Sequence, residues 1–290
     1  MTEHEWLLYN DSPYIKTDSM TSALMNVITG LIAFVLYLLS SLALLLRLRK
    51  QPFFSNKALL HLLLPGFAAV LLHLFILQQQ LLGLSGFQFG FFDAASSVTL
   101  VITLLTLIIT IKRHTEIFAL LIMPLAALML LAQVLTPSSY MLPYDAPQGL
   151  KIHVLVSIIA YSLLALAAGL SLVLSLQNRM LHNHHPGGWL KRLPPLQVME
   201  KLLFDAILAG FIGLTLALLS GFVFLENLFD QHLAHKTVLS IIAWLVFAIL
   251  LIGRFTLGWR GRIAIRWTLG GFISLMLAYF GSKFVLEFIL

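Results

Sequence analysis

Eight long apolar runs, separated by short polar segments, dominate the pattern of residues along the chain. The runs cover about 23–46, 58–81, 93–111, 117–136, 151–177, 203–225, 237–253 and 264–286. Each is about as long as an α-helix must be to cross the hydrocarbon of a bilayer. Backbone groups cannot remain unpaired in lipid, so each run should be helical. The pattern therefore predicts an all-α, polytopic membrane protein built as a bundle of eight transmembrane helices.

The segments outside these runs predict no second folded domain. The first twenty residues, "MTEHEWLLYNDSPYIKTDSM", carry several acidic side chains. They lack the basic start and the cleavage site of a signal peptide. We expect residues 1–22 to form an external polar tail, and residues 23–290 to form one transmembrane domain.

The composition agrees with lipid as the solvent and removes several classes of site. The chain is 60% hydrophobic and 10% charged, whereas soluble domains are usually about 45–50% apolar and about 25% charged. It contains no cysteine, which excludes disulfides, thiolate metal sites and thioether attachment of haem. No phosphate-binding glycine loop, HExxH motif or GxSxG motif occurs, so nothing indicates hydrolysis of ATP or peptides.

Lysine and arginine are distributed unevenly over the connecting segments. Of the 18 in the chain, fourteen follow the first, third, fifth and seventh runs. The four on the other side are Lys16, Lys151, Lys236 and Lys283. Short cytoplasmic loops are enriched in basic residues, so both termini are predicted to lie outside, on the periplasmic side of a bacterial inner membrane. Topology thus accounts for the net charge of +6, and we expect no nucleic-acid partner.

Two histidines are candidates for chemistry because of their depth. His73, in "GFAAVLLHLFIL", falls in the outer half of the second helix. His153 begins the fifth helix at the outer interface, with Ser157 and Tyr161 one and two turns deeper on the same face. Neutral imidazoles facing a common apolar cavity could serve as axial ligands of haem iron. Position alone supports the alternatives equally: a packing hydrogen bond for His73 and exposure to water for His153.

Two further histidines precede the seventh helix. His232 and His235 lie in "LENLFDQHLAHK", on the same external side as His153. The surrounding residues are polar and the spacing is typical of a solvated turn before Lys236. We interpret the pair as part of a wet loop, with at most a supporting role at a site around His153.

Three segments resemble the cytochrome c assembly proteins, the group that includes CcsA, CcmC and HemX-like proteins. They are "IHVLVSIIAYSLLALAAGLSLV", "KTVLSIIAWLVFAILLIGRFTLGWRGR" and "LAYFGSKFVLEFIL". The resemblance covers the second half well and the first half loosely. It implies that His153 is an external haem-ligating histidine, and it places His73 near the family's intramembrane histidine. It also implies non-covalent haem b, and partners among membrane proteins of haem or cytochrome assembly.

The chain departs from the family pattern at three places, one of which is the family's second external histidine, expected after "YFGSKF" and not present there. Before the seventh helix, a tryptophan-rich "WWD" motif is replaced by Gln231, His232, Leu233 and Ala234. A second intramembrane histidine of the family falls near Ile252, which cannot ligate iron. His232 or His235 could therefore act as a substitute ligand.

Two functions follow from this resemblance and its departures. The first is a haem-binding or haem-handling membrane protein that is not itself a catalyst. The site would contain His153, His73, Tyr161, His232 and His235, with His153 and His73 on the iron. The alternative is a membrane scaffold or regulator that keeps the family fold without haem traffic. It would act through the basic cytoplasmic face around "GWRGR".

Overall fold

The computed structural model describes residues 13–50, 58–82, 87–88, 90–113, 115–136, 141–142, 147–182, 193–224 and 234–281. Within these ranges the fold is a helical bundle, and eight helices are long and apolar enough to cross a membrane, which confirms the predicted fold class. The helices are α2 Pro13–Leu48, α4 Leu59–Leu82, α5 Phe91–Arg113, α6 Glu116–Leu135, α7 Gln148–His182, α8 Leu196–Phe224, α9 Ala234–Leu257 and α10 Arg262–Met276. A π-helical turn, η2 Leu277–Gly281, continues α10.

Five helices, α2, α5, α7, α8 and α9, are longer than the apolar runs that predicted them, and three of these are much longer than a bilayer requires. The lengths of α2, α7 and α8 are 36, 35 and 29 residues, or about 54, 52 and 44 Å at 1.5 Å per residue. Helix α2 begins at Pro13 and therefore includes residues 13–22, which we expected to be a polar tail. A helix satisfies its own backbone and can continue through polar sequence beyond the hydrocarbon. The rest of that tail, residues 1–12, lies outside the described residues.

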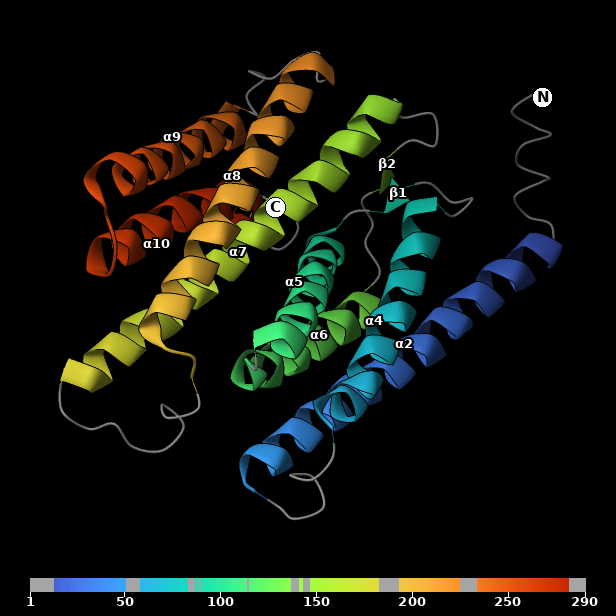
Figure 1. The fold of residues 1–290 in the computed structure, drawn as a ribbon. Coiled ribbons are helices and arrows are strands. Elements are labelled where there is room, and N and C mark those ends of the chain that lie inside the picture. The colour runs from blue at the N-terminus through green and yellow to red at the C-terminus, as the bar shows by residue number, and fades with distance from the viewer. Residues whose placement is uncertain are drawn as a thin grey trace.

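The buried apolar side chains form two clusters, and Figure 1 shows the helices that contribute to them. The N-terminal cluster lies among α2, α4 and α6, and the C-terminal cluster lies mainly among α7, α8, α9 and α10. Helix α5 contributes to both, with Leu100 and Leu107 in the first and Val98 and Ile102 in the second. Helix α5 therefore joins the two halves of the bundle.

The central position of α5 explains its polar composition. Its buried polar side chains are Asp93, Ser96, Ser97, Thr99, Thr103, Thr106 and Thr110. Several donate to a carbonyl of the same helix: Ser97 Oγ to Asp93 O and Thr103 Oγ1 to Thr99 O, both at 2.7 Å. Such side chains would be costly against lipid tails. A helix of this composition consequently belongs in the interior.

Helices α7 and α8 approach each other through small residues. A Cβ atom added to Gly210 would lie 2.7 Å from the Leu164 side chain, and one added to Gly213 would lie 3.0 Å from the Ala160 Cβ. Lipid tails are as apolar as leucine, so close van der Waals packing is a main source of helix association in bilayers. This packing fixes the relative rotation of the two helices that carry the site described below.

A short β contact lies between two of the connections, which the apolar pattern did not predict. Strand β1, Phe87–Gln88, pairs antiparallel with β2, Met141–Leu142. Phe87 is opposite Leu142, and Gln88 is opposite Met141. The α4–α5 and α6–α7 connections are thereby linked at the same end of the bundle.

The connection between α9 and α10 is a tight turn held from a third helix. Gly261 has a φ of 58°, and its N–H donates to Glu200 Oε1 of α8 at 2.9 Å. The Arg254 guanidinium lies 4.3 Å from the centre of the Phe204 ring and donates to the carbonyl of Trp259. The turn therefore connects α8, α9 and α10 at the end of the bundle that carries most of the basic residues.

This turn gives a prediction about stability. Gly261→Ala should destabilise the protein by about 1–3 kcal/mol, because an L side chain is strained at this backbone conformation. The matched control is Gly270→Ala, where an added Cβ meets no atom within 4 Å and where alanine is the better helix former. Thermal unfolding in detergent should show a lower midpoint for the first variant only. Equal midpoints would show that the turn carries no strain.

Candidate functional site

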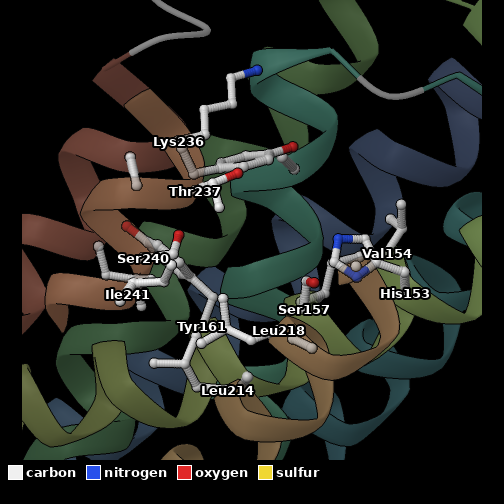
Figure 2. Close-up of a pocket in the computed structure, with 18 of the residues that line it drawn as sticks. His153, Val154, Ser157, Tyr161, Leu214, Leu218, Lys236, Thr237, Ser240 and Ile241 are labelled. Carbon is white, nitrogen blue, oxygen red and sulfur yellow. The ribbon is translucent and has the colours of Figure 1, made fainter. Parts of the chain in front are cut away.

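A cavity of about 440 Å³ lies in the half of the bundle formed by α7–α10. It is located where α5, α7 and α9 begin and where α8 and α10 end, with η2 completing its wall (Figure 2). Most of its lining is apolar, including Val98, Ile158, Leu214 and Phe280. Ligand pockets in proteins typically range from about 300 to 1,000 Å³ and combine apolar walls with a few polar groups. The predicted topology places this cavity on the external side.

His153 lines the cavity, and its ring is oriented by α8, through Ser220 and the backbone of Ala217. Its Nδ1 lies 3.0 Å from Ser220 Oγ on α8. The Ser220 hydroxyl donates to the carbonyl of Ala217 at 2.9 Å, so Ser220 Oγ is left to accept from His153 Nδ1–H. In a neutral imidazole this tautomer leaves the Nε2 lone pair available. Histidines that bind metals are commonly held in the same way, through an N–H to an oxygen on the opposite ring nitrogen.

The other polar groups of the cavity come mainly from α9. Lys236, Thr237 and Ser240 line it from that helix, and Ser157 lines it from α7 (Figure 2). Lys236 has neither a hydrogen bond nor an ion pair with any residue in the part of the chain that the structure describes. The cavity thus presents an imidazole, three aliphatic hydroxyls, the phenols of Tyr161 and Tyr279 and one ammonium within a largely apolar surface.

Tyr161 contributes an aromatic wall. Its ring centre lies 5.4 Å from that of Phe272, 6.4 Å from that of Tyr279 and 5.3 Å from that of Phe280. Two of these partners belong to η2. Wider π-helical turns are frequent at functional sites, and here the turn carries Tyr279 and Phe280 into the cavity lining.

The cavity opens between α8 and α9. Three of its lining residues are also strongly exposed: Leu219 at 59%, Phe222 at 73% and Ile241 at 41%. The first two belong to α8 and the third to α9. Since all three are large and apolar and belong to helices that are apolar enough to cross a membrane, we expect this opening to face lipid tails.

His73 lies elsewhere, in the N-terminal cluster. It is 1% exposed. Its Nδ1 lies 3.3 Å from the Tyr37 hydroxyl of α2, and its Nε2 lies 2.7 Å from Ser96 Oγ of α5. The ring of Tyr37 also makes an edge contact with it. Both ring nitrogens are therefore hydrogen-bonded, and His73 is not among the residues that line the cavity.

From the sequence we expected that His73 and His153 could face a common cavity. In the structure, only His153 lines the cavity. His232 lies outside the described residues. His235 is exposed near the start of α9 and does not line the cavity. In the described part of the chain, no three His, Asp, Glu or Cys side chains meet to hold a metal ion. Of the candidates, His153 and Tyr161 are brought together at one site.

Ser220 and the position of Lys236 in the cavity were not predicted from the sequence. Ser220 is a serine inside the apolar run of α8, and polar residues at such positions often mark a site. Lys236 was interpreted as a charge on the external side and not as a residue that lines a cavity. Its position at the start of an apolar helix, followed by Thr237 and Ser240, was the available signal.

Comparisons with known proteins agree with this picture of the fold. A family model described as cytochrome C assembly protein matches residues 61–290. The inner membrane protein YpjD of Escherichia coli (strain K12) is 30% identical over 223 residues, which cover 76% of this chain and 84% of YpjD. A 28.8 kDa protein of Azospirillum brasilense is 34% identical over 143 residues, 49% of this chain and 53% of that protein.

The cytochrome c biogenesis protein CcsA of Chlamydomonas reinhardtii is similar over a shorter stretch. It is 29% identical over 152 residues, which cover 52% of this chain and 42% of CcsA. No solved structure matches the chain significantly.

The contacts of His73 predict a structural role that can be measured. Tyr37→Phe and His73→Leu should each destabilise the protein by about 1–3 kcal/mol, because each leaves a buried polar partner unpaired. The double variant should cost less than the sum of the two, with a coupling of about 0.5 kcal/mol or more. Thermal unfolding of the four proteins in detergent gives this cycle.

The control pair is Tyr37→Phe with Ser220→Ala, whose residues lie in different halves of the bundle and should give additive effects. Additive effects for Tyr37 and His73 would show that their contact is energetically irrelevant. A loss of bound haem in His73→Leu at unchanged stability would instead support His73 as a ligand.

Proposed function

Because the chain belongs to the cytochrome c assembly protein family, we propose that it binds haem in the cavity between α7, α8 and α9, with His153 as an axial ligand. The family match covers most of the transmembrane region, and one relative is named as a cytochrome c biogenesis protein. The protein would hold or pass on haem without catalysing a reaction. It is a multi-span membrane protein, so partners in haem or cytochrome assembly would meet it in the bilayer.

The hydrogen bond between His153 and Ser220 is the observation that carries this proposal. It fixes the ring and leaves Nε2 as the available ligand atom. Bound haem would supply an iron centre whose axial positions accept neutral imidazole. The residues of the chain then hold the ligand, orient it and keep water away from it.

The remaining surface of the cavity is also compatible with haem. Its walls are apolar, and Tyr161 with its aromatic neighbours forms an aromatic wall about two helical turns along α7 from His153. The absence of cysteine means that any haem would be held non-covalently, as haem b. His73 could bind iron only by giving up the contact with Tyr37 or Ser96, so we favour packing as its role.

The membrane and the orientation of the protein are proposed from a related protein and from the distribution of basic residues. A related protein, YpjD, is named an inner membrane protein, and we propose the bacterial inner membrane for this chain. The distribution of lysine and arginine supports placing both termini on the periplasmic side. The cavity, at the end where α7 and α9 begin, would then face the outer leaflet.

The ligand role of His153 has a direct spectroscopic test. His153→Ala should remove or convert a low-spin haem spectrum, because water or a weaker ligand would replace the imidazole. Ser220→Ala keeps the ligand atom but frees the ring, and should weaken haem binding about tenfold. Titration of purified protein with haem, followed by absorption in the Soret region, measures both effects.

The control is the double variant His232→Ala, His235→Ala, which should alter the spectrum little. If this double variant abolished the spectrum while His153→Ala preserved it, the segment before α9 would be the haem site. A wild-type protein that takes up no haem would favour the scaffold or regulator function.

The proposed orientation predicts the behaviour of terminal fusions. Alkaline phosphatase fused after Leu290, which functions only outside the cytoplasm, should be active, and green fluorescent protein at the same place should be dark. A fusion within the segment 183–192 should show the reverse pattern, because this connection carries basic residues. Bright fluorescence at the C-terminal fusion would invert the topology and place the cavity on the cytoplasmic side.

A further inference from the structure

Lys236 is the one lysine or arginine among the described residues that line the cavity. It lies in the first turn of α9 and is partly buried. Figure 2 shows its side chain at one end of the cavity, beyond Thr237 and Ser240 of the same helix. The opposite end, around Leu214 and Tyr161, is formed by apolar and aromatic side chains (Figure 2).

A charge in such a place is costly unless something compensates it. Partial burial removes water from the ammonium, and a buried ion needs a partner of opposite charge. Within the described residues Lys236 has no such partner. A ligand with an acidic group would supply one through a charge-assisted hydrogen bond, the stronger class of hydrogen bond.

The shape of the cavity indicates the rest of the ligand. The walls beyond Lys236 are apolar, and the opening lies between the exposed side chains of Leu219, Phe222 and Ile241. A ligand that passes between these side chains travels through lipid. It must therefore be largely apolar, with its charge confined to one end.

We propose that Lys236 binds the carboxylate of an amphiphilic acid that enters the cavity from the outer leaflet between α8 and α9. Where the ligand is haem, this inference rests on the proposed function. The propionates of haem are such carboxylates, and His153 would hold the iron. Lys236 is then a specificity-determining residue: it selects the acid over its neutral ester. It also sets which end of the ligand faces the membrane surface.

The test compares acids with their esters. Haem and metal-free protoporphyrin IX, each as the free diacid and as the dimethyl ester, are titrated into protein in phosphatidylcholine nanodiscs, and quenching of tryptophan fluorescence is measured. The wild-type protein should bind each diacid about tenfold or more tightly than its ester. Lys236→Met and Lys236→Gln should lose this preference, and Lys236→Arg should retain it.

Lys151→Met is the matched control. It removes the same charge at the same end of the bundle, from a residue that does not line the cavity, and should keep the preference. Metal-free protoporphyrin cannot be ligated by His153, so it tests Lys236 even if haem ligation fails. If the haem spectrum is lost in His153→Ala alone, the result bears on the proposed function. It does not bear on the inference about Lys236.

Two results would overturn the inference. One is an equal affinity of the wild-type protein for protoporphyrin and its ester. The other is a preference that survives in both Lys236→Met and Lys236→Gln, with helical circular dichroism unchanged. If phosphatidylglycerol bound to the purified protein disappears in these variants while the preference survives, the anion at Lys236 is a lipid headgroup.

Discussion

Polar groups inside the hydrocarbon thickness have no water to pair with, and the arrangement of this bundle follows from where they find partners. The hydroxyl-rich helix α5 lies in the middle, where its side chains meet backbone carbonyls and neighbouring helices. Tyr37 and His73 reach it from α2 and α4 through Ser96. A helix of this composition could not form the lipid-facing surface, and α5 is accordingly the most buried of the eight spans.

The same constraint gives the two histidines different capacities. The fold supplies a hydrogen-bond partner to each ring nitrogen of His73: the Tyr37 hydroxyl and the Ser96 hydroxyl. The Nδ1 of His153 is hydrogen-bonded to Ser220 Oγ. His153 also lines the cavity. A histidine whose hydrogen bonds are all made within the fold contributes to packing. His153, which α8 orients beside a cavity, is positioned to receive a ligand.

The sequence predicted the spans well because lipid imposes a length and an apolarity on every crossing helix. It predicted the importance of His153 because a histidine at the start of an apolar helix is conspicuous. The sequence did not predict the rotation of each helix about its own axis. That rotation turns Ser220 toward His153, turns His73 toward Tyr37 and away from the cavity, and depends on contacts such as Gly210 against Leu164. Lys236 shows the same limit, since charge statistics indicate the side of the membrane and not the direction of a side chain.

The unequal helix lengths bear on the membrane that suits this protein. Helix α6 has 20 residues, or about 30 Å, which equals the usual hydrocarbon thickness. One end is marked by the ion pair of Glu116 with Arg47 at 3.3 Å. The longer α7 and α8 can shift along the membrane normal without exposing an end to lipid, but α6 cannot. Among the described spans, α6 and the combined α10 and η2 are the shortest, at 20 residues each, so a thicker bilayer would have to thin locally around these helices.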